Sequence, residues 1–365
     1  MNQYVIILIW TLILGIYYEL NYMTYHISNN DVKYKKASVL FCIMLVIPLI
    51  LSAAFRTDFG DQGYKISYRI FSNSFFSLIS SIESGVKGPG YQIIQYLGTI
   101  FFGNNAEIFF FMIASLQMYS LVRLYRKYSS DVWIAMFVFV ASTDYLSWMQ
   151  NGIRQFIAVT FIILFSDWIF EKKYLRICII IIIASTIHTS ALLMLPIVFI
   201  IQGEAFNKKT ILVIVATILA LTMLGRLVPA LNLLLADTEY NNAIIDWQTS
   251  GNDGVNFFRV LVYSVPTLLS FLGIKKIRQS GNYVINVVCN MGVVSTLLYI
   301  MGMFTSGIYI GRLPIYCSLY SNGILLPWLI RRLFTKESSR LVVMIMVIAY
   351  IAFYYYQTHY VWGII

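Results

Sequence analysis

A series of long apolar segments constrains the fold of this chain more than any other feature. Ten of them lie near 3–19, 38–55, 106–122, 132–148, 152–170, 210–228, 257–274, 283–304, 309–330 and 340–358. About 17 to 25 apolar residues in a helix are enough to cross a bilayer. Backbone polar groups cannot stay unpaired in lipid, so each segment is predicted to be a helix. We therefore expect an all-α, polytopic integral membrane protein with about ten crossings.

The composition excludes other classes of protein. Only 12% of the 365 residues are charged and 59% are hydrophobic, whereas soluble domains carry about 25% charged residues. This argues against a soluble enzyme, a disordered chain and a disulfide scaffold. The four cysteines lie in apolar runs and are interpreted as small buried hydrophobic residues, and three histidines are too few for a His-rich metal site. The N-terminus lacks the cationic start of a cleavable signal peptide, so 3–19 is expected to remain as a span.

The distribution of Lys and Arg predicts the orientation. Eighteen of the 26 lie in the segments 20–37, 123–131, 171–176, 202–209, 275–282 and 331–340. The positive-inside rule assigns these six segments to the cytoplasm, and it explains the net charge of +10 without nucleic acid as a partner. Both termini and the segments 56–105, 148–152, 229–256 and 305–309 then face outside.

All six cationic segments lie on the cytoplasmic side only if 174–201 enters the membrane and returns. A single crossing there would move every later cationic loop to the outer side, so we expect a re-entrant or short hairpin with its tip near His188. The apolar residues 91–103, behind a turn at 88–90, are expected on the outer surface or in a re-entrant segment. No internal repeat or soluble domain is visible. We expect one transmembrane domain, 1–365, with outer-face segments 56–105 and 229–256.

Eight cations remain on the outer side. They are Arg56, Lys65, Arg69, Lys87, Arg154, Arg226, Arg259 and Arg312. Six of these are arginine, whose planar guanidinium binds phosphate or carboxylate in a bidentate way. Ionisable groups near the ends of membrane helices are costly unless they line a functional cavity. The alternative for any one of them is anchoring to lipid headgroups.

The densest polar cluster follows the second apolar segment. Arg56, Asp58 and Asp61 bring one cation and two carboxylates to the end of a helix, with Tyr64 just beyond. A carboxylate here acts as a general base towards a hydroxyl, or it holds Arg56 in place. The aromatic side chains of the outer segments belong to the interfacial belt or stack on sugar rings.

Three further sites carry candidate residues. Asn151, Arg154 and Gln155 open the fifth crossing, where the helix N-terminus with its arginine forms an anion site or is capped by Asn151. His188 transfers a proton or contacts a ligand near the outer face, or it is a hydrogen-bonded structural residue. Arg312 and Tyr316 repeat the pattern at the outer start of the ninth crossing.

These motifs occur together in a recognisable order. They are Arg56-x-Asp58-x-x-Asp61-x-x-Tyr64 with Tyr68 and Phe71, Pro89-Gly90-Tyr91, Asn151-x-x-Arg154-Gln155-x-x-Ala158, His188-Thr189-Ser190-Ala191 before Pro196, and Arg312-x-x-x-Tyr316. In this order, over residues 50 to 320, the chain resembles the Wzy/EpsG-type bacterial polysaccharide polymerases. It departs from that pattern at Gly88, where an acidic residue is expected.

The resemblance implies a membrane glycosyltransferase of the GT-C class. Such enzymes join undecaprenyl-diphosphate-linked oligosaccharide repeat units into O-antigen, capsule or exopolysaccharide on the outer face of the bacterial inner membrane. It implies neither a metal nor an organic cofactor. The implied partners are the lipid-linked oligosaccharide, membrane lipid and a chain-length regulator protein.

Under this hypothesis the candidate residues divide into two groups. The developing charge of the diphosphate is met by the arginines, and the attacking hydroxyl gives its proton to a base. The binding group is Arg56, Tyr64, Asn151, Arg154, Gln155, Arg312 and Tyr316. The base candidates are Asp58, Asp61 and His188.

Three other functions compete with polymerisation. An O-antigen-ligase-like transferase uses the same donor with a different acceptor. A transporter or flippase of lipid-linked oligosaccharides is expected to show duplicated halves and polar groups at the midplane, and here the polar groups gather at one face. An intramembrane O-acyltransferase using His188 is the third.

Overall fold

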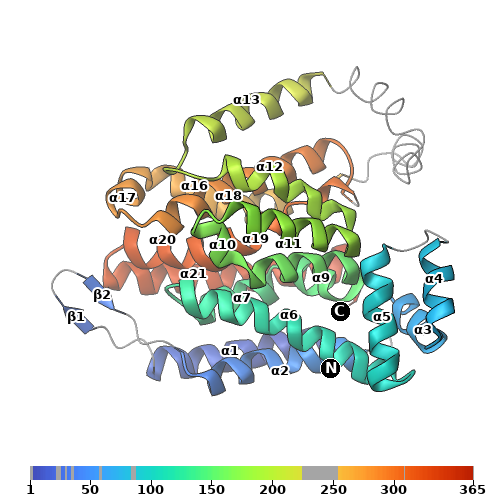
Figure 1. Cartoon of the computed structure of the whole chain (residues 1–365). Helices are drawn as coiled ribbons and strands as arrows, with labels where there is room; N and C mark the ends of the chain where they lie inside the picture. The colour runs from blue at the N-terminus through green and yellow to red at the C-terminus, as the bar shows by residue number, and fades with distance from the viewer. Residues whose placement is uncertain are drawn as a thin grey trace. The chain divides into compact units, whose positions relative to one another are not determined.

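The computed structural model describes residues 3–21, 26–28, 31–33, 37–56, 60–83, 88–223, 254–307 and 309–364. Helices dominate these residues (Figure 1). A small antiparallel ribbon of β1 (His26–Ser28) and β2 (Asp31–Lys33) pairs Ile27 with Val32. The all-α prediction is confirmed apart from this ribbon. The chain packs into two compact units, 1–195 with 334–365 and 196–333.

The first unit contains the N-terminal helices and the last one. Its helices are α1 (Gln3–Asn21), α2 (Val39–Phe55), α3 (Gly63–Arg69), α4 (Phe75–Glu83), α5 (Pro89–Phe102), α6 (Ala106–Tyr128), α7 (Val132–Ala141), α8 (Asp144–Asn151), α9 (Ile153–Leu164), α10 (Ser166–Phe170), α11 (Tyr174–Ile187), the 3₁₀ helix η1 (Thr189–Leu193), α21 (Lys336–Tyr355) and the π-helix η4 (Tyr356–Val361). Helix α12 (Met194–Ile200) runs across the boundary between the units.

The second unit contains the remaining helices. They are α13 (Lys208–Thr222), α16 (Phe257–Leu272), α17 (Ile274–Gln279), α18 (Tyr283–Phe304), the 3₁₀ helix η2 (Ile310–Arg312), α19 (Ile315–Tyr320), the π-helix η3 (Ser321–Leu325) and α20 (Leu326–Leu333). Helix α18 packs against α16, α19 and η2.

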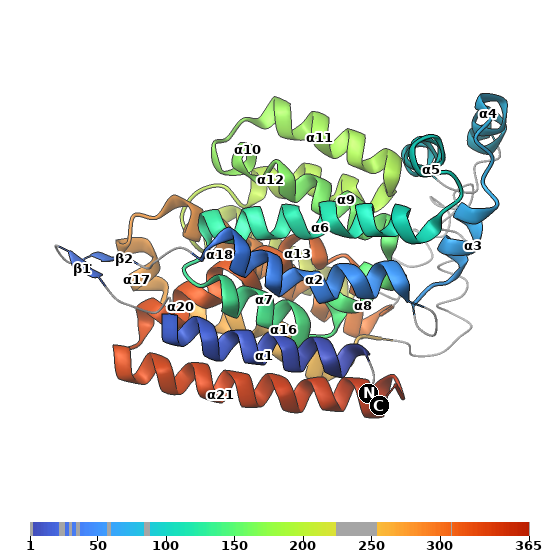
Figure 2. The same ribbon diagram turned by 90° about the horizontal axis from the view of Figure 1, so that it is seen from below.

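Short polar side chains set where several helices begin. Ser38 caps α2 by accepting a hydrogen bond from Phe41 N, and Asn105 caps α6 by accepting one from Ile108 N. Such caps satisfy the backbone N–H groups that a helix start leaves unpaired. Helix α6 then packs against α2 and α9, and these helices lie beside one another in Figure 2. The apolar runs therefore begin and end at polar residues, as the sequence pattern predicts.

All ten predicted segments are helical over the residues that the structure describes. Five helical stretches in that part of the chain are long and apolar enough to cross a membrane, namely α1, α6, α18, Ile310–Leu333 and Glu337–Val361. A sixth results if α7 and α8 are one span, although they meet at 68°. The count of ten crossings and the GT-C assignment stay predictions.

Two predicted segments are interrupted. The segment 132–148 bends after α7, at Thr143, whose φ is +68°. The segment 152–170 breaks at Phe165, between α9 and α10, so its apolar helix ends at Leu164. The expectation of two continuous helices is therefore wrong. The first bend directs α8 towards the end of α2, which it contacts.

The predicted outer segment 56–105 folds into three short helices. Helix α5 runs across the direction of α6: it is seen lengthwise in Figure 1 and end-on in Figure 2, where α6 is seen lengthwise. It buries Tyr91, Gln95 and Thr99 while Leu97 and Phe101 are exposed. An amphipathic helix of this kind suits the membrane surface. The place of 91–103 on the outer surface or in a re-entrant segment stays a prediction.

The predicted hairpin tip coincides with a break in the helix. Helix α11 ends at Ile187, His188 is extended (φ −151°, ψ 119°), and η1 packs back against α11 and α9. The re-entrant character of 174–201 stays a prediction.

Candidate active site

Arg56 is the buried centre of a polar cluster in the first unit. It follows α2 directly, and its side chain is 1% exposed. Its Nη1 donates to Ala53 O (2.5 Å) and its Nη2 to Asp61 O (3.4 Å), while Cζ lies 5.1 Å from the centre of the Phe110 ring. Within the described residues its buried Nε has no hydrogen-bond partner, and no carboxylate lies within 4 Å of the guanidinium. Arg56 is therefore a buried cation that the described residues leave without an ion-pair partner.

The surroundings bear on the charge of Arg56. Burial lowers the pKa of this guanidinium, and the nearby carboxylate of Asp61 opposes that shift. An arginine side chain stays protonated in proteins even so. A buried charge without a partner is costly, so this position favours an anion as ligand.

A second cation, Lys65, is buried beside Arg56. Its Nζ donates to Arg56 O (2.9 Å) and lies 3.7 Å from Glu107 Oε1, which also binds Arg69 Nη2 at 2.5 Å. Burial lowers the pKa of Lys65, and Glu107 opposes this shift. Glu107 therefore offsets one of the two charges of Lys65 and Arg69, while Lys65 fixes the backbone at Arg56.

Asp61 is exposed, and the backbone on both sides of it is fixed. Its Oδ1 accepts a hydrogen bond from Gly63 N (2.8 Å), and its N donates to Gln150 O (3.2 Å). Gly60 adopts φ +74°, which favours glycine, and packs against Gln150. Gly60 and Asp61, which precede α3, are thus attached to the end of α8. The other carboxylate candidate, Asp58, lies outside the described residues.

Tyr64 connects this loop to the fifth apolar segment. Its hydroxyl accepts a hydrogen bond from Arg154 Nε (3.3 Å), and its ring meets Tyr91 edge-on with the ring centres 5.8 Å apart. Tyr91 is fully buried on the first turn of α5. Burial raises the pKa of Tyr91, and the charges of Arg154 and Arg56 partly oppose this. Arg56, Tyr64, Tyr91 and Arg154 therefore form one cluster.

The residues flanking Arg154 take different positions. Gln155 is buried in α9. Asn151 is exposed, and its Nδ2 donates to Ser147 Oγ (2.9 Å) within α8. The N-cap of α9 is Gly152, without a side-chain hydrogen bond. The alternative in which Asn151 caps α9 is therefore wrong, because α8 extends through Asn151 and Gly152 takes the N-cap position of α9.

His188 lies at the end of α11 and is half-buried. Its Nδ1 is 2.7 Å from Ser190 Oγ, and Ser190 N donates to Nδ1 at 3.4 Å. The start of α5 packs against Thr186, two residues before His188, since a Cβ at Gly88 or Gly90 would overlap Thr186. Tyr91 follows directly, so α5 links the His188 turn to the cluster. A side chain at position 88 has no room here, because its Cβ would lie 2.4 Å from Thr186 O.

Arg312 and Tyr316 belong to the second unit. Arg312 ends η2 and is half-buried, and Tyr316 is buried on α19 one turn later. A close approach of Gly311 to Gly302 holds η2 against α18: a Cβ at Gly302 would lie 3.0 Å from Gly311 Cα. Their place in one site with the first-unit cluster stays a prediction.

The comparison with protein families decides the identity. The EpsG family matches residues 39–363, nearly the whole chain. This chain belongs to the EpsG family. Membership indicates a polysaccharide polymerase in a membrane, and it confirms the resemblance that the motifs suggest. No curated protein and no solved structure matches the chain.

The site of this EpsG-family protein contains residues that the motif analysis did not single out. Gln150 holds the Asp61 loop by its backbone, and its side chain accepts from Tyr4 Oη (2.8 Å) and donates to Ser52 Oγ (3.1 Å). Tyr91 and Lys65 complete the cluster. Tyr91 stands in the Pro89-Gly90-Tyr91 motif, which was the available signal. Nothing in the sequence distinguishes Gln150 from other polar residues near helix ends.

Proposed function

We propose that this EpsG-family protein polymerises oligosaccharide repeat units carried on undecaprenyl diphosphate, on the outer face of the bacterial inner membrane. One observation carries the proposal. Arg56 and Arg154, from segments about a hundred residues apart, are held in one cluster by Tyr64 and Tyr91. That cluster has a buried cation with no ion-pair partner among the described residues. A diphosphate is an anion that suits such a site.

The reaction in this proposal exchanges one bond for another. A hydroxyl oxygen of the incoming unit attacks the anomeric carbon of the growing chain, and the bond from that carbon to the diphosphate oxygen breaks. The lipid diphosphate leaves with the electron pair, and the hydroxyl proton passes to a base. Guanidinium groups fixed before the reaction stabilise the developing negative charge.

Three residues are proposed as the base. Asp61 is exposed beside Arg56, with one carboxylate oxygen held by Gly63 N (2.8 Å). His188 has its imidazole oriented through Nδ1 by Ser190 (2.7 Å). Asp58 precedes Asp61 by three residues. A positioned carboxylate or imidazole within reach of the hydroxyl suffices for general base catalysis.

The arginines replace a metal ion in this proposal. Among the described residues, no group of three or more His, Cys, Asp or Glu is placed to hold a metal. Arg312 with Tyr316, and Asn151 with Gln155, are proposed to extend the diphosphate and saccharide site. A chain-length regulator is the proposed protein partner.

Product analysis tests the proposal. The purified protein in lipid vesicles is incubated with lipid-linked repeat units, with and without EDTA, and the products are separated by size. A ladder of products that differ by one repeat unit is expected in both reactions. Transfer of single units to another acceptor alone would indicate a ligase, and translocation without new glycosidic bonds would indicate a flippase. Either result would contradict polymerisation.

A further inference from the structure

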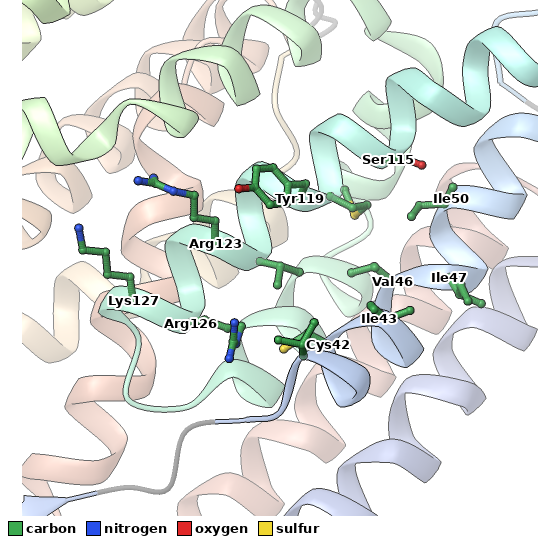
Figure 3. A pocket seen from close by; sticks show the side chains of 13 residues that line it. Cys42, Ile43, Val46, Ile47, Ile50, Ser115, Tyr119, Arg123, Arg126 and Lys127 are labelled. Atoms are coloured by element: carbon green, nitrogen blue, oxygen red, sulfur yellow. The ribbon is translucent and has the colours of Figure 1, made fainter.

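A groove runs along the faces of the packed helices α2 and α6, at the end of these helices that lies away from Arg56. Six residues of α2, from Val39 to Ile50, and seven of α6, from Ser115 to Lys127, line about 580 Å³ of space (Figure 3). Pockets that hold small molecules measure about 300 to 1,000 Å³. The residues from each helix recur at intervals of three or four, so they form one face of that helix. The groove therefore has room for a ligand.

The groove has the length of one bilayer leaflet. Val39 and Ile50 are eleven residues apart, which is about 16 Å along a helix. Half the hydrocarbon core of a bilayer is about 15 Å. The walls between these limits are mainly Ile, Val, Met and Cys side chains, and Ile43 and Ile47 are nearly half exposed. A hydrocarbon chain fits such walls along most of their length.

The cations of the groove all lie at one end. Arg123, Arg126 and Lys127 occupy this end, opposite Ile50 and Ser115 in Figure 3. Asp167 binds Arg123 (2.7 Å) and Lys127 (2.9 Å), so it offsets one of the three charges.

Arg126 is the cation that remains available. Its Nε donates to Ala37 O (3.2 Å), and within the described residues its Nη atoms have no hydrogen-bond partner. The positive-inside rule places this end at the cytoplasmic surface. A phosphate group at this end can accept hydrogen bonds from both Nη atoms of Arg126.

We propose that this groove binds one anionic phospholipid of the cytoplasmic leaflet. One acyl chain lies between α2 and α6, and the phosphate binds Arg126, with Arg123 and Lys127 beside it. A soluble anion leaves the apolar walls uncovered, and a zwitterionic lipid gains less from the surplus charge. The proposal does not depend on the proposed polymerase reaction.

Native mass spectrometry tests the head-group contact. The detergent-purified full chain is titrated with phosphatidylglycerol and with phosphatidylcholine of the same acyl chains. Wild type is expected to retain one phosphatidylglycerol at least about tenfold more tightly than phosphatidylcholine. Arg126→Gln should remove that preference. The control Lys275→Gln removes an exposed cation of another cationic loop and should keep it.

A second variant tests the apolar part independently. Ile43→Trp fills the groove, and Leu40→Trp places the same side chain on the exposed surface of α2 away from the groove. Phosphatidylglycerol should raise the melting temperature of wild type and Leu40→Trp, because a ligand that binds the folded state stabilises it, and it should not raise that of Ile43→Trp. Equal affinity for the two lipids in wild type, or unchanged binding in both Arg126→Gln and Ile43→Trp, would overturn the proposal.

Discussion

Arg154 joins the polar cluster around Arg56 through one hydrogen bond, from its Nε to the hydroxyl of Tyr64 3.3 Å away. That bond uses the nitrogen nearest the side-chain stem and leaves the guanidinium fork for a ligand. A lysine in its place offers a compact point charge on a flexible chain, without the paired donors that match a diphosphate.

Arg154→Ala is expected to lower the polymerisation rate by about 10²- to 10³-fold, the usual cost of losing one donor to a developing anion. Arg154→Lys should also impair the reaction, by at least about tenfold. The measurement is the rate of ladder formation at equal protein levels in the membrane.

Arg340→Ala is the matched control, because Arg340 is exposed at the start of α21, in a predicted cytoplasmic loop. Normal chain length in both Arg154 variants would mean that this arginine only anchors the helix to headgroups.

Helix α5 depends on two glycines for its place against α11. A Cβ at Gly90 would overlap Thr186 Oγ1 and lie 2.9 Å from Thr186 C, and the backbone atom cannot move aside easily. The same contact fixes Tyr91, the next residue, with its ring edge-on to that of Tyr64. Packing at the start of one helix therefore positions an aromatic side chain of the proposed site.

Gly90→Ala should destabilise the protein by about 1 to 3 kcal/mol, the usual cost of overpacking, and should reduce polymerisation. Thermal unfolding in detergent gives the first quantity and the product ladder the second. Gly152→Ala is the comparison for stability, because its Cβ would meet nothing closer than 3.5 Å. Equal stability of the two variants would show that α5 does not pack as described.

A carboxylate joins the C-terminal end of α6 to the helix that follows α9, at the ends of α6 and α9 that lie away from Arg56. Asp167 on α10 binds Arg123 (2.7 Å) and Lys127 (2.9 Å) and accepts from Tyr128 Oη (2.5 Å). Burial alone would raise the pKa of Asp167, but these three partners outweigh it and lower the pKa to about 2. The ionised form is therefore favoured in the folded protein.

Asp167→Asn should cost about 2 kcal/mol of stability at pH 7, from a pKa lowered from 3.8 to about 2. A lowered pKa stabilises the fold above the unfolded pKa, so the difference from wild type should be full above about pH 5 and vanish as the pH falls through about 2. Thermal unfolding at several pH values measures it.

Glu171→Gln removes a surface ion pair with Lys173 and should cost under about 1 kcal/mol. A loss for Asp167→Asn no larger than this would contradict the assigned pKa shift.

At the scale of the whole molecule, the first unit has its predicted cytoplasmic cations at one end of its helices and the proposed site at the other. At one end, Arg126 binds Ala37 O (3.2 Å) and Arg123 binds Leu164 O (2.9 Å). At the other, Arg56 contacts Phe110 and Arg154 contacts Tyr64. Helices α2 and α6 therefore run antiparallel and α6 and α9 run parallel, with the cationic loops together and the proposed site at the opposite end.

Cysteine labelling of intact cells tests the orientation. Asn73→Cys lies in the exposed turn before α4 and should react with a membrane-impermeant thiol reagent. Lys275→Cys lies in a predicted cytoplasmic loop and should react only after the membrane is permeabilised. The four native cysteines are buried or half-buried. The reverse pattern would place the proposed site in the cytoplasm.

Much of the fold could be predicted from the sequence because the limits of a membrane helix depend on the hydropathy and charge of consecutive residues. The helix starts at Val39, Ala106 and Tyr283 lie within a residue or two of the predicted ones. The break at His188 falls where charge alternation requires a turn. The bend at Thr143 was missed, since an apolar run has the same composition whether straight or bent.

The candidate site could be predicted only in part. Arg56, Tyr64 and Arg154, which the motif analysis singled out, lie in one cluster. Asn151 instead binds within its own helix. The role of Asp61 as a base and the convergence with Arg312 stay predictions.

The sequence by itself determined that this is a helical membrane protein of the EpsG family, where its helices end and which ends carry positive charge. Only the tertiary structure decided that Tyr91 packs against Tyr64, that Gln150 binds Asp61, that Gly88 has no room for a side chain, and that α2 and α6 leave a groove. The reason is physical: each of these depends on distances between helices far apart in the chain, which packing sets and local pattern does not.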